Sequence, residues 1–96
     1  MNHISYEKAI HLTNEIGAIL LDVQLPIDYE KKHIPGSYNI PLEQLRNTIR
    51  KIYPNPYTVF IVCCQQGIRS KVGASILENM GYQNVFNLNG GFENGG

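Results

Sequence analysis

The chain has 96 residues, a length that allows one compact domain around a single core. Hydrophobic residues make up 43% and charged residues 17%, which is a globular rather than a disordered composition. Eight basic residues balance eight acidic ones, so the chain lacks the excess positive charge of a nucleic-acid-binding protein. The longest apolar runs, at 18–21 and 59–64, are too short to span a bilayer, and we expect no membrane association.

The two cysteines are adjacent, at Cys63 and Cys64. They therefore cannot form the long-loop disulfides that stabilise small secreted domains. Residues 1–5 also lack the basic start and apolar continuation of a secretory signal peptide. Two free thiols favour a reducing compartment, so we expect a cytoplasmic protein whose cysteines are available for chemistry.

The first third of the chain predicts a helix followed by a buried strand. The helix begins after Ser5, whose hydroxyl suits an N-cap, and ends at Gly17, which can adopt the left-handed conformation of a helix end. Residues 18–23 are a continuous apolar run with one acid, which is typical of a strand buried on both faces in a parallel sheet. A polar helical turn at 28–32 follows Pro26.

The middle third predicts a short extended segment, an amphipathic helix and a strong strand. Residues 38–40 are extended, and Pro41 suits the first turn of the helix that follows. Apolar residues recur along this helix at spacings of three and four: Leu42, Leu45, Ile49 and Ile52. Pro54 ends it, and the β-branched and aromatic residues at 57–63 predict the next strand.

The last third predicts a helix at 70–79 and a final strand at 84–88. Apolar residues share one stripe along this helix: Val72, Ile76 and Met80. Strands that alternate with helices imply a parallel sheet covered on both faces. We expect one domain over residues 1–96 with a three-layer α/β/α fold, a mostly parallel sheet of four or five strands, and a short or loosely ordered tail at 92–96.

The loop after the strand at 57–63 contains the candidate nucleophile, Cys64. In parallel α/β sheets, ligands bind beyond the carboxyl ends of the strands. A loop wrapped around a helix N-terminus directs several backbone N–H groups and the helix dipole at one point, which stabilises negative charge on sulfur. Gly67 permits the positive φ that such a loop needs, and Arg69 and Lys71 offer positive charge for an anionic substrate.

This loop resembles the active loop of the rhodanese-like sulfurtransferases, in which a cysteine and four variable residues precede an arginine or another polar residue. The matching segment here is Cys64, Gln65, Gln66, Gly67, Ile68, Arg69 and Ser70. Two further family motifs are similar to Leu-Asp-Val at 21–23 with His-Ile-Pro-Gly at 33–36, and to Leu-Asn-Gly-Gly-Phe at 88–92. The three motifs cover nearly the whole chain in the family's order and imply the rhodanese-like fold.

The resemblance implies transfer of sulfane sulfur through a persulfide on Cys64. The Cys64 thiolate would take the outer sulfur of thiosulfate or of a persulfide donor, and a thiol or cyanide acceptor would then remove it. The acceptor thiol can belong to a small molecule or to another protein. Backbone N–H groups of the loop would hold the terminal sulfur, and we expect Asp22 to tie the loop by accepting hydrogen bonds. The resemblance implies no metal and no organic cofactor.

The chain departs from the family pattern in ways that make the loop less positive. Gln24 stands where the family usually has arginine, and Asp28 where it usually has glutamate. Gln65 and Gln66 are neutral where members that use thiosulfate often have a basic residue. Since a less positive loop attracts a dianion weakly, a persulfide is at least as plausible a donor as thiosulfate.

Two other functions stay open from the sequence. Counted from Cys63 to Arg69, the loop has the spacing of cysteine phosphatases and arsenate reductases, although Val62 stands where phosphatases usually have histidine. A non-catalytic sulfur carrier or binding module would need the same loop as the enzyme. Cys63 is expected to point to the opposite face of the strand from Cys64 and to pack in the core.

The remaining polar motifs predict structure rather than chemistry. His3 and His11 share no ligand spacing with the cysteines, so no zinc site is expected. The Asn-Gly-Gly sequence at 89–91 has no lysine followed by serine or threonine, so it predicts a turn rather than a phosphate loop. His33 precedes a Pro-Gly turn and is expected to be a structural hydrogen-bonding group. The alternative role for Arg69 is an ion pair with a surface acid.

Overall fold

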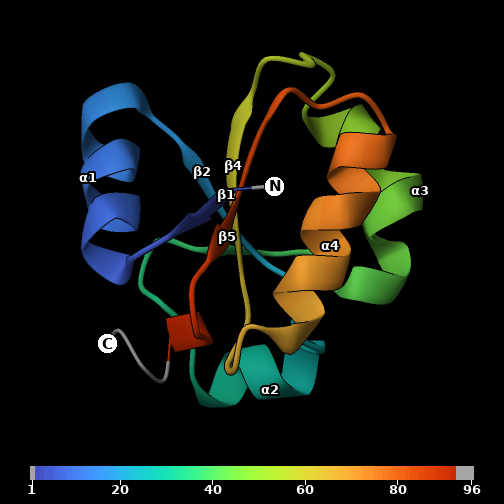
Figure 1. Ribbon diagram of the computed structural model, residues 1–96. Coiled ribbons are helices and arrows are strands. Elements are labelled where there is room, and N and C mark those ends of the chain that lie inside the picture. The colour runs from blue at the N-terminus through green and yellow to red at the C-terminus, as the bar shows by residue number, and fades with distance from the viewer. Residues whose placement is uncertain (1, 93–96) are drawn as a thin grey trace.

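The sheet at the centre of the protein has five strands in the order β1-β5-β4-β2-β3, and each pair of neighbours is parallel. The computed structural model describes residues 2–92 (Figure 1). The strands are β1 (Asn2–Ile4), β2 (Ile19–Asp22), β3 (Tyr38–Asn39), β4 (Val59–Cys63) and β5 (Asn84–Leu88). The helices are α1 (Tyr6–Ile16), α2 (Pro26–Lys31), α3 (Leu42–Ile52) and α4 (Ile68–Asn79). The predicted α/β fold with a parallel sheet is confirmed.

Helices cover both faces of the sheet, with α1 on one face and α3 and α4 on the other (Figure 1). Side chains of β4 alternate between the two resulting cores because successive residues of a strand point to opposite faces. Phe60 and Val62 pack in the core under α3 and α4, whereas Ile61 and Cys63 pack in the core under α1. All four residues are fully buried, as expected for a strand covered on both faces.

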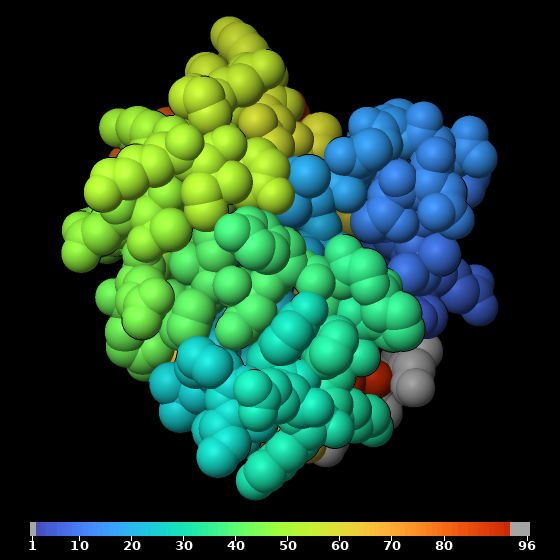
Figure 2. Space-filling model, turned by 180° about the vertical axis from the view of Figure 1, so that it is seen from behind, coloured from blue at the N-terminus to red at the C-terminus, as the bar shows by residue number. Residues whose placement is uncertain are grey.

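Helix α2 lies at the carboxyl end of the strands, beside the loop that follows β4 (Figure 1). It begins with Pro26 shortly after β2 ends, so the chain reaches this end of the sheet and turns there. Seen from behind, the segment from α2 through α3 covers much of the molecule, with α1 beside it (Figure 2). This arrangement leaves the loop after β4 bordered by α2 and by the start of α4.

Several element boundaries differ by one or two residues from the sequence-based expectation, and two of these differences have local reasons. The strand expected from residue 57 begins at Val59, because Asn55 closes a turn in which it accepts hydrogen bonds from the backbone N–H groups of Tyr57 and Thr58. The helix expected from residue 70 begins at Ile68, so the loop is shorter than predicted and its last residues form the first turn of α4.

The apolar stripe predicted for α4 is partly wrong, because Ile76 and Met80 pack against the core but Val72 does not. The buried side of α4 consists of small residues and one leucine, Ser70, Gly73, Ala74 and Leu77, whereas Val72 is 50% exposed. A Cβ atom on Gly73 would lie 3.2 Å from Cγ1 of Val62 and 3.3 Å from Cγ1 of Val23. Small residues therefore face the sheet because α4 lies too close to it for branched side chains.

Two parts of the chain near its ends extend the fold beyond the predicted elements. Strand β1, which the sequence analysis did not predict, pairs with β5, and Ile4 O accepts a hydrogen bond of 2.8 Å from Asn89 N–H. Phe92, the first residue of the tail predicted to be short or loosely ordered, is buried in the α1-side core, and 93–96 lie outside the described residues. No helix within residues 2–92 is long and apolar enough to cross a membrane.

Candidate active site

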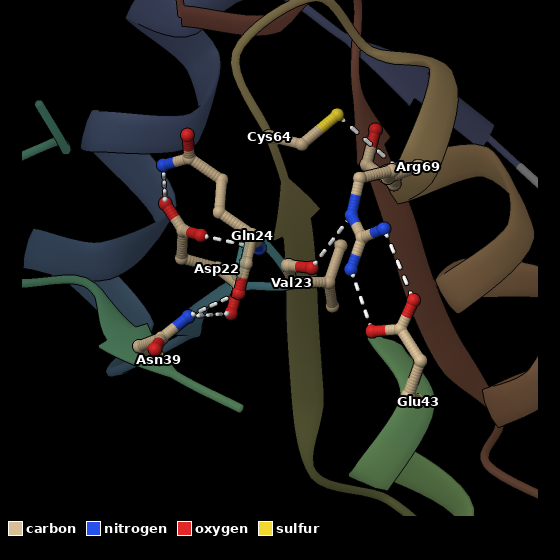
Figure 3. A network of polar contacts seen from close by, with 8 residues as sticks. Asp22, Val23, Gln24, Asn39, Glu43, Cys64 and Arg69 are labelled. Carbon is tan, nitrogen blue, oxygen red and sulfur yellow. Dashed lines mark hydrogen bonds and ion pairs between the residues drawn. The ribbon is translucent and has the colours of Figure 1, made fainter. Parts of the chain in front are cut away.

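Cys64 directly follows β4, and its sulfur points toward the start of α4 (Figure 3). Sγ accepts hydrogen bonds from the backbone N–H groups of Gly67, at 3.1 Å, and Ser70, at 3.3 Å. Gly67 has a φ of 87°, a left-handed conformation that turns the chain into α4 at the next residue. Two N–H dipoles and the N-terminus of a 12-residue helix thus meet at Sγ, where they stabilise negative charge.

The turn after β5 packs directly against the loop that contains Cys64. A Cβ atom on Gly67 would lie 3.1 Å from the backbone nitrogen of Gly91, and one on Gly91 would lie 2.6 Å from the backbone nitrogen of Gly67. The backbone N–H of Phe92 donates a 3.2 Å hydrogen bond to the carbonyl of Cys64. The two glycines therefore allow a backbone-to-backbone contact that holds the loop in place.

Arg69 binds two neighbouring segments instead of projecting freely into solvent (Figure 3). Its Nε donates to the carbonyl of Val23 at 3.1 Å. Its Nη1 and Nη2 donate to the two carboxylate oxygens of Glu43 at 3.1 and 2.8 Å, and this pairing lowers the pKa of Glu43. The sequence left two roles open for Arg69, binding an anionic substrate and pairing with a surface acid. In this structure Arg69 pairs with a surface acid, Glu43.

Asp22 lies at the end of β2, fully buried, and accepts two hydrogen bonds from Gln24 (Figure 3). The backbone N–H of Gln24 donates to Oδ1 at 2.8 Å, and its side-chain Nε2 donates to Oδ2 at 2.9 Å. Asn39 on β3 donates to the carbonyls of both residues. Burial raises the pKa of Asp22, and these hydrogen bonds partly offset that effect. The network gives the segment after β2 a defined conformation at the edge of the site.

A pocket of about 390 Å³ opens beside Cys64. Its lining comes from the segment after β2 and from the loop after β4: Gln24, Leu25, Asp28, Cys64, Gln65, Gln66, Ile68 and Arg69. Five of the predicted site residues line it directly. Gly67 and Ser70 instead donate their N–H groups to Sγ, and Asp22 lies behind the pocket, where it binds Gln24. The structure thus brings the predicted set together around one cavity.

Four residues around this pocket were not predicted as site residues, and one of them is Gln24, which follows β2 and lines the pocket. Leu25 and Asp28 line it, and Glu43 holds Arg69 from the first turn of α3. Their common signal is position, because each follows the carboxyl end of a strand at the same edge of a parallel sheet. Lys71, which the sequence suggested as an additional cation for the site, lines a separate hollow with His3.

Cys63 lies on the opposite face of the sheet from Cys64, in the α1-side core, and both cysteines are free thiols. It is fully buried, and burial raises its pKa well above the usual range, with further increases from the negative charges of Asp22 and Cys64. Nδ1 of His33 donates a 2.6 Å hydrogen bond to the carbonyl of Tyr29, and the imidazole stacks on the Tyr29 ring. Within residues 2–92, no group of three His, Cys, Asp or Glu side chains could hold a metal ion.

Comparison with known proteins gives the family. The model of the rhodanese-like domain matches residues 5–95. The chain belongs to the rhodanese-like family. The thiosulfate sulfurtransferase PspE of Escherichia coli (strain K12) is 34% identical over 70 residues, which cover 73% of this chain and 67% of that protein. The thiosulfate sulfurtransferase GlpE of Pseudomonas syringae pv. syringae (strain B728a) is 34% identical over 80 residues, covering 82% of this chain and 73% of that protein.

The rhodanese-like fold is also shared with solved structures. The human single-domain sulfurtransferase TSTD1 superposes with a TM-score of 0.85 at 22% identity, covering 97% of this chain and 93% of that chain. At this identity the likeness concerns the fold. The family and its sulfurtransferase relatives support assignment of this chain to a rhodanese-type sulfurtransferase class.

Proposed function

We propose that this protein moves sulfane sulfur from thiosulfate or a persulfide donor to a thiol or cyanide acceptor through a persulfide on Cys64. The observation that carries the proposal is the convergence of two backbone N–H groups, from Gly67 and Ser70, on the sulfur of a cysteine that lines a pocket. These donors stabilise the Cys64 thiolate, which attacks the sulfur donor in the first step and is the leaving group in the second step.

The reaction has two displacement steps on sulfur. In the first step the Cys64 thiolate attacks the outer sulfur of the donor, the S–S bond of the donor breaks, and sulfite or a thiolate departs with the electron pair. In the second step the acceptor attacks the outer sulfur held on Cys64, and the Cys64 thiolate departs. Of the remaining predicted site residues, Gln65, Gln66, Ile68 and Arg69 line the pocket, and Asp22 holds the segment after β2 through Gln24 and not the loop after β4. No redox partner enters this balance.

Three further observations bear on the alternatives. The relatives PspE and GlpE are thiosulfate sulfurtransferases by name, which supports thiosulfate as one donor to test. The two free thiols favour the cytoplasm as the compartment. A phosphatase mechanism through Cys63 is disfavoured, because that side chain is buried on the far face of the sheet and the loop N–H groups point at Cys64. A sulfur carrier would use the same loop and differ only in turnover.

The test is intact mass under non-reducing conditions after incubation of the reduced protein with thiosulfate or with a persulfide. We expect one added sulfur in the wild type and in Cys63→Ala, and none in Cys64→Ser. Steady-state production of thiocyanate from cyanide separates an enzyme from a carrier that loads once. Absence of added sulfur from both donors, or loading that persists in Cys64→Ser, would overturn the proposal.

A further inference from the structure

We infer that this site takes its sulfur from an organic persulfide with an uncharged substituent in preference to the thiosulfate dianion, and that Glu43 and Asp28 determine this selectivity. The inference rests on the proposed sulfur transfer through Cys64. It follows from the charges that surround the pocket and from the apolar side chains that line it.

The positive charge of Arg69, which lines the pocket, is already neutralised by an ion pair with Glu43. Arg69 has five N–H donors, and it uses three of them, one on the carbonyl of Val23 and two on the carboxylate of Glu43 (Figure 3). A bidentate arginine–carboxylate pair is a strong and directional contact. An anionic donor would therefore meet a guanidinium group whose charge Glu43 already neutralises and which has two N–H donors left, whereas an uncharged donor does not depend on that charge.

A carboxylate without an ion-pair partner lines the same pocket. Asp28 lies on α2, and within residues 2–92 no cation pairs with it. Lys31, one turn further along α2, forms no ion pair with Asp28 in this part of the chain, Nζ of Lys32 lies 5.8 Å from the ring centroid of Phe92, and Lys71 lines a different hollow. Together with Glu43, which pairs with Arg69, the pocket contains one positive group, Arg69, and two negative groups, Asp28 and Glu43. This excess of negative charge repels a dianion.

The pocket also presents apolar surface beside the nucleophile. Leu25 is 43% exposed and Ile68 is 69% exposed, and both line the cavity that contains Cys64. The organic group of a persulfide can bury its surface against these side chains, and the three oxygens of a sulfite leaving group cannot. Exposed leucine and isoleucine side chains at a reaction site favour a substrate that covers them.

The first step with this donor balances without any additional reactant. The Cys64 thiolate attacks the outer sulfur of R–S–SH, a new S–S bond forms at Sγ, and the bond between the two donor sulfurs breaks. The thiolate R–S⁻ departs with the electron pair, and the proton stays on the outer sulfur that Cys64 now holds. The negative charge passes from one thiolate to another, so the site does not have to bind the two charges of thiosulfate.

The experiment compares three donors that differ in charge: thiosulfate, N-acetylcysteine persulfide with one carboxylate, and its methyl ester with none. Single-turnover loading of Cys64 is followed by quenching and intact mass, with Cys64→Ser as the blank. In the wild type we expect the ester to load fastest and thiosulfate slowest. Glu43→Gln keeps an acceptor for Arg69 and Asp28→Asn keeps the side-chain shape, while each removes one negative charge.

In these two variants the ratio of the thiosulfate rate to the ester rate should rise by about fivefold, the effect expected from one partly exposed charge. Glu30→Gln is the matched control, because Glu30 is an exposed acid on α2 that does not line the pocket, and the ratio should stay at its wild-type value. An unchanged ratio in both pocket variants, or thiosulfate loading as fast as the ester in the wild type, would overturn the inference and leave sulfur transfer intact. Failure of all three donors would overturn both.

Discussion

Gly91 is the position where a single methyl group tests whether the turn after β5 holds the loop that contains Cys64. Its φ is 71°, so alanine there adopts a left-handed conformation at a cost of about 1 kcal/mol relative to glycine. The added Cβ would also lie 2.6 Å from both the carbonyl carbon of Gln65 and the backbone nitrogen of Gly67, and closer still to Gln65 O. Ordinary contact begins near 3.4 Å, so the loop would have to move by at least about 0.8 Å.

The displacement should affect both stability and chemistry. Overpacking against backbone costs about 1–3 kcal/mol, which with the conformational cost gives a loss of about 2–4 kcal/mol for Gly91→Ala. The shift moves the Gly67 N–H away from Sγ of Cys64, and we expect sulfur loading to slow by about tenfold or more. Urea unfolding measures the first effect, and quenched intact mass measures the second.

Gly17→Ala is a control with nearly the same backbone and no collision. Gly17 has a φ of 69°, and a Cβ atom there would meet no atom within 4 Å. This variant should lose about 1 kcal/mol and load sulfur at the wild-type rate. Equal losses of stability in the two variants, or wild-type loading in Gly91→Ala, would refute the role given to this turn.

Two further predictions concern the buried groups near the site. Cys63→Ser should lose about 1–3 kcal/mol of unfolding free energy, because its hydroxyl would enter an apolar core without a partner, yet it should still load sulfur; loss of loading in a folded variant would contradict this. For Asp22, burial raises the folded-state pKa above 3.8, so its contribution to stability is full below that pH and is lost as the pH rises through the raised pKa. Asp22→Asn should therefore gain stability relative to the wild type as the pH rises from 4, which urea unfolding across pH measures. A difference in unfolding free energy between the two proteins that does not change with pH would contradict a raised pKa of Asp22.

The loop around Cys64 was predictable because its signal is local. A β-branched and aromatic run marks β4, and the glycine three residues after Cys64 marks the turn into α4. Both features lie within a dozen residues of one another. Parallel topology then places the loop at the carboxyl edge of the sheet, and the motif at 21–23 reaches the same edge at the end of β2.

The features that escaped prediction depend on contacts between distant segments. Glu43 and Arg69 are 26 residues apart, and their ion pair requires the starts of α3 and α4 to meet. The buried side of α4 depends on the close approach of Gly73 to Val62, which the apolar pattern of the helix does not contain. Strand β1 has three residues and gains its conformation from pairing with β5, so it has no periodicity of its own.

The placement of the two cysteines determines the route by which sulfur can leave under the proposed mechanism. Successive residues of a strand point to opposite faces of the sheet. Cys64, just after β4, therefore packs in the core under α3 and α4, and Cys63, the last residue of β4, packs in the core under α1. The high pKa of the buried Cys63 thiol keeps it protonated and therefore a poor nucleophile. A sulfur atom on Cys64 consequently has no acceptor in its neighbour. It must pass to a nucleophile that enters the pocket from outside, across the same apolar rim of Leu25 and Ile68 that the donor meets.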